Sequence, residues 1–386
     1  MTTHAHRAAL PPAPKPGDAC PPLEPLGSDH AWLGALAGVQ QSADHHGEGD
    51  VLRHTQMVAD ELLADARWQA LEAATRNELW LAALLHDVGK PATTRLEDGR
   101  WRAPGHARRG AIIARRVLWE AGVDPAARER ICALVRHHMV PHFLIDAPAA
   151  EATRRAIAIA LEWGGGAAPQ YLLTRADALG RIAADRDAMA TNVELFAELC
   201  RDLGCLDTAY PFATAHARFT FFGRGDRDPA YAAHDTTRSR VVLLSGLPGA
   251  GKDLWIHRHG DGRPVVSLDD LRRARGARRS DKAAQGQIIQ QARELARTHL
   301  RAGEPFVWNA TNLSAQMRRQ LIDLFASYDA HVTIVAVEAP ATDLDRRNRD
   351  REHPVPADAL ERMLGQWEAP TLTECHELVV WDATSP

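Results

Sequence analysis

The sequence has few cysteines, no long apolar run and little net charge. Its five cysteines, Cys20, Cys132, Cys200, Cys205 and Cys375, include no C-x-x-C pair, and such an odd set favours reduced thiols over a disulfide framework. No apolar run approaches the roughly 18 residues that cross a bilayer, and the N-terminus lacks the charged and apolar regions of a signal peptide. We therefore expect a cytoplasmic protein without a membrane partner.

The charge balance restricts the possible ligands. Lysine and arginine number 46 against 50 acidic residues, a net charge of -4, which excludes a generally cationic surface. A nucleic-acid contact would therefore need a local basic cluster such as residues 271–282 (LRRARGARRSDK), although a solvated loop is the usual reason for such a run. The 19 histidines are in excess, and because histidine is the commonest metal ligand they predict a metal site.

The length of 386 residues exceeds one ordinary core and predicts at least two domains. Residues 1–27 are rich in proline and predict a flexible tail. Helical patterns fill residues 28–222, and a polar stretch at 223–239 is a plausible linker. In residues 240–386, short β-rich runs alternate with helices, which predicts a parallel sheet flanked by helices. The expected fold class is an all-helical domain followed by an α/β domain.

A glycine-rich loop follows the first strand of the α/β domain. The segment GLPGAGK has the G-x-x-x-x-G-K spacing of a P-loop, in which backbone N–H groups and a lysine bind nucleotide phosphates. A carboxylate replaces the usual Ser or Thr that binds Mg²⁺, and it can still bind the metal directly or through water. The expected ATP- and Mg²⁺-binding residues are Gly246, Gly249, Ala250, Gly251, Lys252 and Asp253.

Charged residues further along this domain suit phosphoryl transfer. Asp269 follows the next predicted strand, where it can accept a proton from an attacking hydroxyl or simply cap the following helix. Arg272 lies three residues on. Arg347 and Arg351 are four residues apart and would share a helical face. Two guanidiniums there suit a transferring phosphoryl group, and a solvated basic face is the alternative.

The P-loop with this Asp and Arg set resembles the 5′-OH polynucleotide kinases of the phage type, over about residues 238–370. The resemblance implies that Lys252 binds ATP phosphates and that Asp269 is the general base for a polynucleotide 5′-OH. It further implies that Arg272 positions the acceptor phosphate, and that Arg347 and Arg351 belong to a lid over the transferred phosphate.

Part of the histidine surplus is ordered along the helical domain. Each such histidine alone is more often a helix cap or a satisfied core residue. Together they recur on separate predicted helices, which is how metal sites in helical bundles are built. The series is His54, His86-Asp87, His106, His137-His138 and Asp177.

The order H, HD, H, HH, D resembles the binuclear members of the HD-domain phosphohydrolase superfamily, over about residues 40–205. The resemblance implies four core ligands, His54, His86, Asp87 and Asp177, with Asp87 as the bridge. It implies that His106, His137 and His138 complete a second metal site, and that Lys90 either supports a metal ligand or contacts phosphate. Imidazole-rich ligation suits two ions of Mn, Fe, Co, Ni or Zn better than Mg²⁺.

An HD domain followed by this type of kinase resembles the bifunctional bacterial enzymes that heal broken nucleic-acid ends. The resemblance implies an ATP-dependent 5′-OH kinase joined to a hydrolase of 2′,3′-cyclic phosphate or of 2′- and 3′-phosphate ends. Its substrate would be nucleic-acid ends, foremost of RNA, and a downstream ligase would use the product. Two alternatives remain open: a nucleotide phosphohydrolase fused to a small-molecule kinase, and a non-catalytic ATP-binding sensor.

Overall fold

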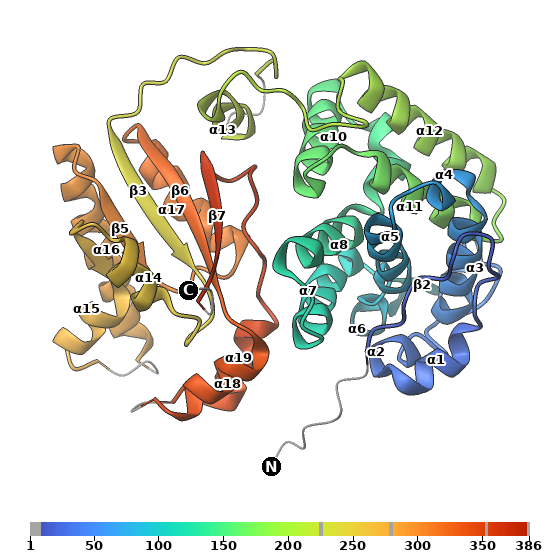
Figure 1. Cartoon of the computed structure of the whole chain (residues 1–386), viewed down its shortest axis with the longest axis horizontal. Coiled ribbons are helices and arrows are strands. Elements are labelled where there is room, and N and C mark those ends of the chain that lie inside the picture. Colours follow the sequence, from blue (N-terminus) through green and yellow to red (C-terminus); the bar gives the residue numbers. More distant parts are fainter. Residues whose placement is uncertain (1–8, 224–226, 278–280, 352–353, 384–386) are drawn as a thin grey trace. The chain divides into compact units, whose positions relative to one another are not determined.

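The computed structural model describes residues 9–223, 227–277, 281–351 and 354–383. The chain divides into two compact units between Pro211 and Phe212 (Figure 1). Residues 1–8 of the expected tail, 224–226 of the expected linker, 278–280 of the basic cluster and the last three residues lie outside the described residues. In the part of the chain that is described, no helix combines the length and the apolar character that crossing a bilayer requires.

The first unit is built from helices and one small hairpin. Its elements are α1 (Leu23–Asp29), α2 (Ala31–Gly34), α3 (Val51–Ala64), α4 (Ala66–Gln69), α5 (Ala73–Leu85), α6 (Lys90–Thr93), β1 (Arg95–Glu97), β2 (Arg100–Arg102), α7 (His106–Glu120), α8 (Pro125–His137), α9 (Val140–Phe143), the 3-10 turn η1 (Leu144–Asp146), α10 (Ala149–Trp163), α11 (Ala168–Leu179) and α12 (Arg186–Asp202).

Local sequence fixes where the main helices of this unit begin. The Asp50 side chain accepts a hydrogen bond from Arg53 N at the start of α3, and Asp124 caps α8 ahead of Pro125; these are preferred residues at the Ncap and N1 positions. Helix α5 is buried on all sides from Glu78 to its end, as expected of a helix inside a core. It therefore holds the residues that follow it, His86-Asp87, in the interior.

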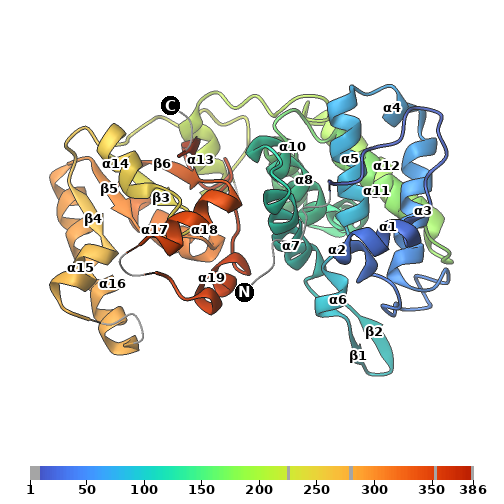
Figure 2. The ribbon, with the colours of Figure 1, turned by 60° about the horizontal axis from the view of Figure 1, so that its bottom comes forward.

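The β1–β2 hairpin is an addition to the expected helical domain. Its strands are antiparallel, and the two turn residues, Asp98 and Gly99, both have positive φ, at 51° and 74°. Asp-Gly favours this tight two-residue turn because it tolerates positive φ at both positions. Figure 2 shows the hairpin projecting from the end of the unit that contains α6.

Residues 9–27 pack against the first unit, so the expectation of a flexible tail is wrong for this part. Trp80 Nε1 donates to Pro11 O at 3.1 Å, and Leu23 N donates to Gln56 Oε1 at 2.7 Å. Leu23 itself is 1% exposed. Buried Leu23 and these hydrogen bonds thus fix the segment to the core helices.

The second unit contains a five-stranded, fully parallel sheet with helices around it. Its elements are α13 (Ala215–Gly223), β3 (Ser239–Ser245), α14 (Lys252–His259), β4 (Val265–Ser267), α15 (Leu268–Ala274), α16 (Lys282–Ala302), β5 (Phe306–Asn309), α17 (Ala315–Ala326), β6 (Ala330–Glu338), α18 (Ala341–Arg349), α19 (Ala357–Leu364) and β7 (Glu377–Asp382). The strand order is β4-β5-β3-β6-β7.

Alternating side chains of the central strand β3 serve both faces of the sheet. Val241 and Leu243 pack with α16 and α17, whereas Val242 and Leu244 pack with Trp255 of α14. Strand β3 also lies where the chain changes direction across the sheet, between β5 and β6. In parallel α/β sheets ligands bind beyond the carboxyl ends of the strands at such a point, and there β3 runs into the glycine-rich loop.

Helix α13 belongs to the second unit, although the expected first domain extended to residue 222. Arg218 donates to the carbonyl groups of Leu372 and His376, and the Phe219 ring stacks on His376 with centroids 4.0 Å apart. The apolar and aromatic side chains of α13 explain why it packs on the sheet instead of ending the helical domain.

Candidate functional site

A carboxylate surrounded by imidazoles forms the centre of the first unit. The Asp87 carboxylate lies 3.2 Å from His86 Nε2, 3.4 Å from His106 Nε2, 3.8 Å from His138 Nε2 and 3.9 Å from His54 Nε2. The residues come from four different helices or their ends, and Asp87, His86, His54 and His138 are all buried. We call His54, His86, Asp87, His106, His138 and Asp177 the histidine cluster.

The ring nitrogens are oriented for metal binding. Nδ1 of His86, His106 and His138 lies 2.7–2.8 Å from the carbonyl oxygen three residues earlier, and Nδ1 of His54 lies 3.0 Å from Gly180 O. A ring that donates from Nδ1 leaves Nε2 unprotonated and turned toward Asp87. Such bonds from the second nitrogen are the usual support of metal-binding histidines.

The histidine cluster contains two possible cation positions that share Asp87. One is formed by His54, His86 and Asp87 and the other by Asp87, His106 and His138, and the ligand atoms within each group lie within 4.8 Å of one another. Among the described residues, His86 Nε2 and Asp87 Oδ1 are buried without a hydrogen-bond partner. Because buried polar atoms are normally paired, these two atoms fit the role of ligands to divalent cations.

Asp177 closes one side of the histidine cluster. Its carboxylate lies 3.1 Å from His54 Nε2, 3.1 Å from His142 Nε2 and 2.7 Å from Arg181 Nη2. His142 is buried and was not expected here. His138 and His142 are four residues apart, a spacing that can place two side chains on the same side of a helical segment.

His137 is the residue that the sequence placed wrongly. Its Nε2 atom lies 2.9 Å from Glu162 Oε2 on α10, outside the two cation groups. Successive residues of a helix point about 100° apart, so only one member of the His137-His138 doublet can face Asp87. The expectation that His137 completes a metal site is therefore corrected.

The charge states of Asp87 and His138 favour metal ligation. Burial alone would raise the pKa of the Asp87 carboxyl, but Lys90 and His86 hold that pKa well below its usual range. Burial, together with His106 and His86, lowers the pKa of His138 to about 3. An ionised carboxylate and neutral imidazoles are the forms that bind metals.

Lys90 and a cavity complete the site. Lys90 Nζ lies 2.7 Å from Asp87 Oδ2 and donates to Gln41 Oε1 at 2.6 Å. A cavity of about 360 Å³ opens above them, which is within the range of small-molecule sites. It is lined by residues of the cluster and its surroundings, including His54, Asp87, Lys90, Trp101, Arg102, His106, His138, Phe143, Asp177, Arg181 and Met189.

Glu48 supports the histidine cluster from outside. Its Oε1 atom lies 3.0 Å from His54 Nδ1 and 2.8 Å from His46 Nδ1. Burial acts to raise the pKa of Glu48, yet its hydrogen bonds with these histidines and with Ile182 N hold the pKa below the usual range. An anionic Glu48 therefore fixes the His54 ring, which leaves Nε2 free for the cluster.

In the second unit, the glycine-rich loop adopts a conformation that requires its glycines. Gly249 and Gly251 have φ of 85° and 112°, and a Cβ on Gly246 would lie 2.3 Å from Val337 O. Ala250 is buried. Lys252 Nζ donates to the carbonyl oxygens of Gly246 and Leu247 at 2.9 and 3.0 Å, so the lysine folds back over the loop.

The other residues expected at this site differ in whether they contact the glycine-rich loop. Asp253 Oδ1 accepts from Asn309 Nδ2 at 2.9 Å, at the end of β5. Arg347 Nη1 lies 3.4 Å from the carbonyl oxygens of Gly249 and Ala250. Helix α18 ends at Arg349, so Arg351 lies beyond it and the expected shared helical face of Arg347 and Arg351 is wrong.

Asp269 and Arg272 form an ion pair at the start of α15. Asp269 is exposed, and the cap of this helix is instead Ser267, whose Oγ accepts from Asp270 N. The capping explanation for Asp269 therefore does not apply, and its carboxylate, paired with Arg272, lies at the carboxyl end of β4. Arg272 also donates from Nη2 to Gln285 Oε1 at 2.9 Å.

Comparison with known proteins identifies both units. A family model described as HD domain matches residues 50–164, and one described as AAA domain matches residues 241–370. The chain carries an HD domain followed by a P-loop domain that matches this AAA model. An HD domain implies divalent metals, and a P-loop implies a bound nucleotide.

Curated relatives match the HD region. A CC-adding tRNA nucleotidyltransferase from Thermus thermophilus is 42% identical over 109 residues, 28% of this chain and 23% of the relative. A Multifunctional CCA protein from Halorhodospira halophila is 41% identical over 113 residues, 29% of this chain and 25% of the relative. The chain thus spans about a quarter of the length of these relatives. The structure of a sugar kinase from Janibacter sp. is 22% identical, with a TM-score of 0.30, over 38% of this chain and 87% of that protein.

Proposed function

We propose that the protein heals broken RNA ends, as a polynucleotide 5′-OH kinase and a metal-dependent hydrolase of 2′,3′-cyclic phosphate or of 2′- and 3′-phosphate ends. The observation that carries the proposal is the presence, in one chain, of the histidine cluster around Asp87 and of a P-loop with an exposed acid, Asp269, at the next strand. Relatives of the HD region that are named for tRNA nucleotidyl transfer favour RNA over DNA.

In the kinase domain, Asp269 accepts the proton of the 5′-OH while that oxygen bonds to the γ-phosphorus of ATP and the bond to ADP breaks. Lys252 and Arg347 neutralise the transferred phosphoryl group. Asp253 would hold Mg²⁺, and Arg272 holds the acceptor phosphate near Asp269. The ion pair between Asp269 and Arg272 positions the carboxylate at the carboxyl end of β4.

In the HD domain, His54, His86, Asp87, His106, His138 and Asp177 would hold two divalent ions of Mn, Fe, Co, Ni or Zn. Such ions supply a deprotonated water near neutral pH and neutralise a phosphate. Lys90 donates to a phosphate oxygen next to Asp87, and Arg181 fixes Asp177. The products, 5′-phosphate and free 3′-hydroxyl ends, suit a ligase as the downstream partner.

The test uses a short RNA with a 5′-OH and a 2′,3′-cyclic phosphate, incubated with ATP, Mg²⁺ and Mn²⁺ and analysed at both ends by mass spectrometry. We expect Lys252→Ala and Asp269→Ala to abolish 5′ phosphorylation while 3′-end hydrolysis continues. His86→Ala and Asp87→Ala should do the reverse. Loss of both activities in every variant contradicts two independent sites.

The same assay separates the alternatives. Faster phosphorylation of nucleosides or sugars than of 5′-OH RNA supports a small-molecule kinase fused to a nucleotide hydrolase. The cavity of about 360 Å³ in the HD domain is large enough for the substrate of such a hydrolase. ATP binding without turnover on any acceptor supports a sensor.

A further inference from the structure

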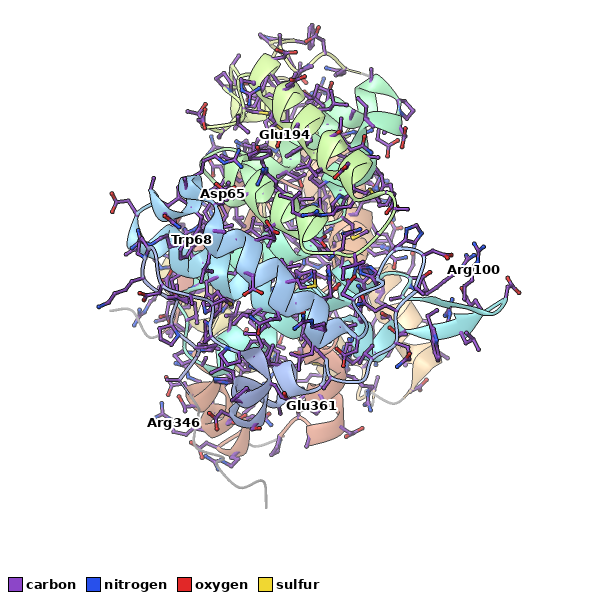
Figure 3. All side chains as sticks on the ribbon, turned by 90° about the vertical axis from the view of Figure 1, so that its right-hand side faces the viewer. Asp65, Trp68, Arg100, Glu194, Arg346 and Glu361 are labelled. Atoms are coloured by element: carbon purple, nitrogen blue, oxygen red, sulfur yellow. The ribbon has the colours of Figure 1, made fainter. Side chains whose placement is uncertain are left out.

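The β1–β2 hairpin connects two residues of the histidine cluster. Lys90 begins α6 just before β1, and His106 begins α7 just after β2. Both side chains contact the Asp87 carboxylate, at 2.7 and 3.4 Å. The base of the hairpin is therefore fixed to the cluster on both sides, while its tip projects beyond the helices; Figure 3 shows Arg100 on this projection.

The two faces of the hairpin differ in chemistry. Leu96 pairs with Trp101, Arg95 with Arg102 and Glu97 with Arg100. Because directly opposed residues share a face, one face is an apolar pair and the other carries three arginines against one glutamate. Arg95 Nε lies 2.6 Å from Glu97 Oε1, so the charge face keeps a positive excess.

The apolar pair is not used by the core. Trp101 is 38% exposed and Leu96 58% exposed, although a tryptophan gains most when its ring is covered. Trp101 and Arg102 also line the cavity that contains Asp87 and Lys90. The cavity thus extends from the histidine cluster to a ring and a guanidinium on the hairpin.

We propose that the hairpin is a binding platform for a single-stranded polynucleotide whose 3′ end lies in the cavity. Trp101, supported by Leu96, stacks on a base close to that end. Arg100 and Arg102, on the opposite face of the two-stranded ribbon, bind phosphates of the backbone where it passes the edge of the hairpin. The inference rests on the proposed function, because it names the part of the HD domain that holds the same RNA end. Aromatic stacking combined with positive charge along the backbone is the pattern that binds single-stranded nucleic acid with little sequence preference.

The platform is tested by comparing substrates. Wild type is first assayed on an RNA of about ten nucleotides with a 3′-terminal phosphate and on glycerol 2-phosphate, which has no base. Trp101→Ala should raise KM for the RNA by roughly 5- to 100-fold, the range for one stacked base. The increase in KM for glycerol 2-phosphate should be at least fivefold smaller. Trp101→Phe, which keeps an aromatic face, should recover most of the affinity. Equal losses on both substrates, or an unchanged KM for RNA, would overturn the platform.

A binding measurement distinguishes this inference from the proposed function. Fluorescence anisotropy with a labelled single-stranded RNA should give a salt dependence whose slope falls by about 0.7 in Arg100→Ala. Arg201→Ala, an exposed arginine on α12, is the matched control and should keep the wild-type slope. If wild type hydrolyses no RNA end, the proposed function fails; if it does and Arg100→Ala matches Arg201→Ala, the platform alone fails.

Discussion

His106 Nε2 lies 3.1 Å from His138 Nε2, and both atoms face Asp87 Oδ1. Two unprotonated ring nitrogens so close to a carboxylate oxygen repel one another unless a cation or a shared proton lies between them. The neighbouring His137 points to Glu162 instead. Of the two neighbouring histidines, His138 therefore belongs to the histidine cluster, and His137 connects α8 to α10.

His138→Ala is expected to lower the bound metal by about one ion per chain and to reduce hydrolysis at least tenfold, because it removes a nitrogen from the second cation group. His137→Ala is the matched control and should keep its metal. Metal content by plasma mass spectrometry after dialysis checks both variants. Equal metal loss in the two would show that the doublet does not divide in this way.

Asp253→Ala is expected to raise the Mg²⁺ concentration for half-maximal kinase activity roughly tenfold, because the variant loses a carboxylate that follows the P-loop lysine. Asp253→Asn keeps a group that can bond to Asn309 and loses only the charge. A Mg²⁺ titration at saturating ATP compares the two. A wild-type Mg²⁺ dependence in both variants would place the metal elsewhere.

Glu129 connects the helices that carry His106 and His138. It lies 2.6 Å from Arg115 Nη2 on α7 and 2.8 Å from Arg128 Nε on its own helix, α8. Burial acts to raise the pKa of Glu129, but the two guanidiniums lower it to about 2. Since this folded pKa lies below the ordinary value of 4.5, the ionised form stabilises the fold above about pH 4.5, and this stability is lost as the pH falls toward 2.

Glu129→Gln should cost on the order of 3 kcal/mol at pH 7, because it removes the charge of a carboxylate bonded to two buried guanidiniums. The loss should shrink as the pH falls from 4.5 toward 2. Glu120→Gln removes the partner of Arg116 at the surface and should change stability by less than about 1 kcal/mol. Denaturant unfolding at several pH values measures both, and a pH-independent loss for Glu129→Gln would contradict the argument.

Gly89→Ala should destabilise the HD domain by about 2–3 kcal/mol. A Cβ at this position would lie 2.1 Å from His106 O and 2.7 Å from Gly110 N, so α7 would have to move away from the residues around Asp87. Gly286→Ala has open space on the exposed side of α16 and should stabilise its own unit by about 1 kcal/mol. Unfolding curves that resolve the two units should show a lower free energy of unfolding for Gly89→Ala and a higher one for Gly286→Ala.

The sequence predicted the candidate sites best at positions where few residue types can serve, such as the glycines of the P-loop and the metal-type ligands. The P-loop spacing and the order of His54, His86-Asp87 and His106 predicted groups that come together in space, because glycines and metal-type ligands tolerate few substitutes. It could not choose between His137 and His138, or find His142, because ring direction depends on where α8 ends. The Asp98-Gly99 turn was visible as a hairpin signal, but its flanking residues are too polar to suggest a strand.

Strand β7 and the place of helix α13 in the second unit could not be predicted from local sequence. The β7 residues show little burial alternation, and α13 is held by Arg218 and Phe219 through contacts with residues more than 150 positions later. Such contacts leave no local pattern. For Arg351 the reason is local. The prediction placed it on the same helical face as Arg347, but α18 ends before it.

The position of α13 determines how the two proposed activities could be separated. A cut at residues 223–239 would leave the second unit without the helix whose Arg218 binds the backbone ahead of β7 and whose Phe219 covers His376. Expression of residues 1–211 and 212–386 as two proteins follows the division of the chain itself. Each fragment would then keep its own core, and mixing them would show whether the proposed healing of RNA ends needs a covalent connection at all.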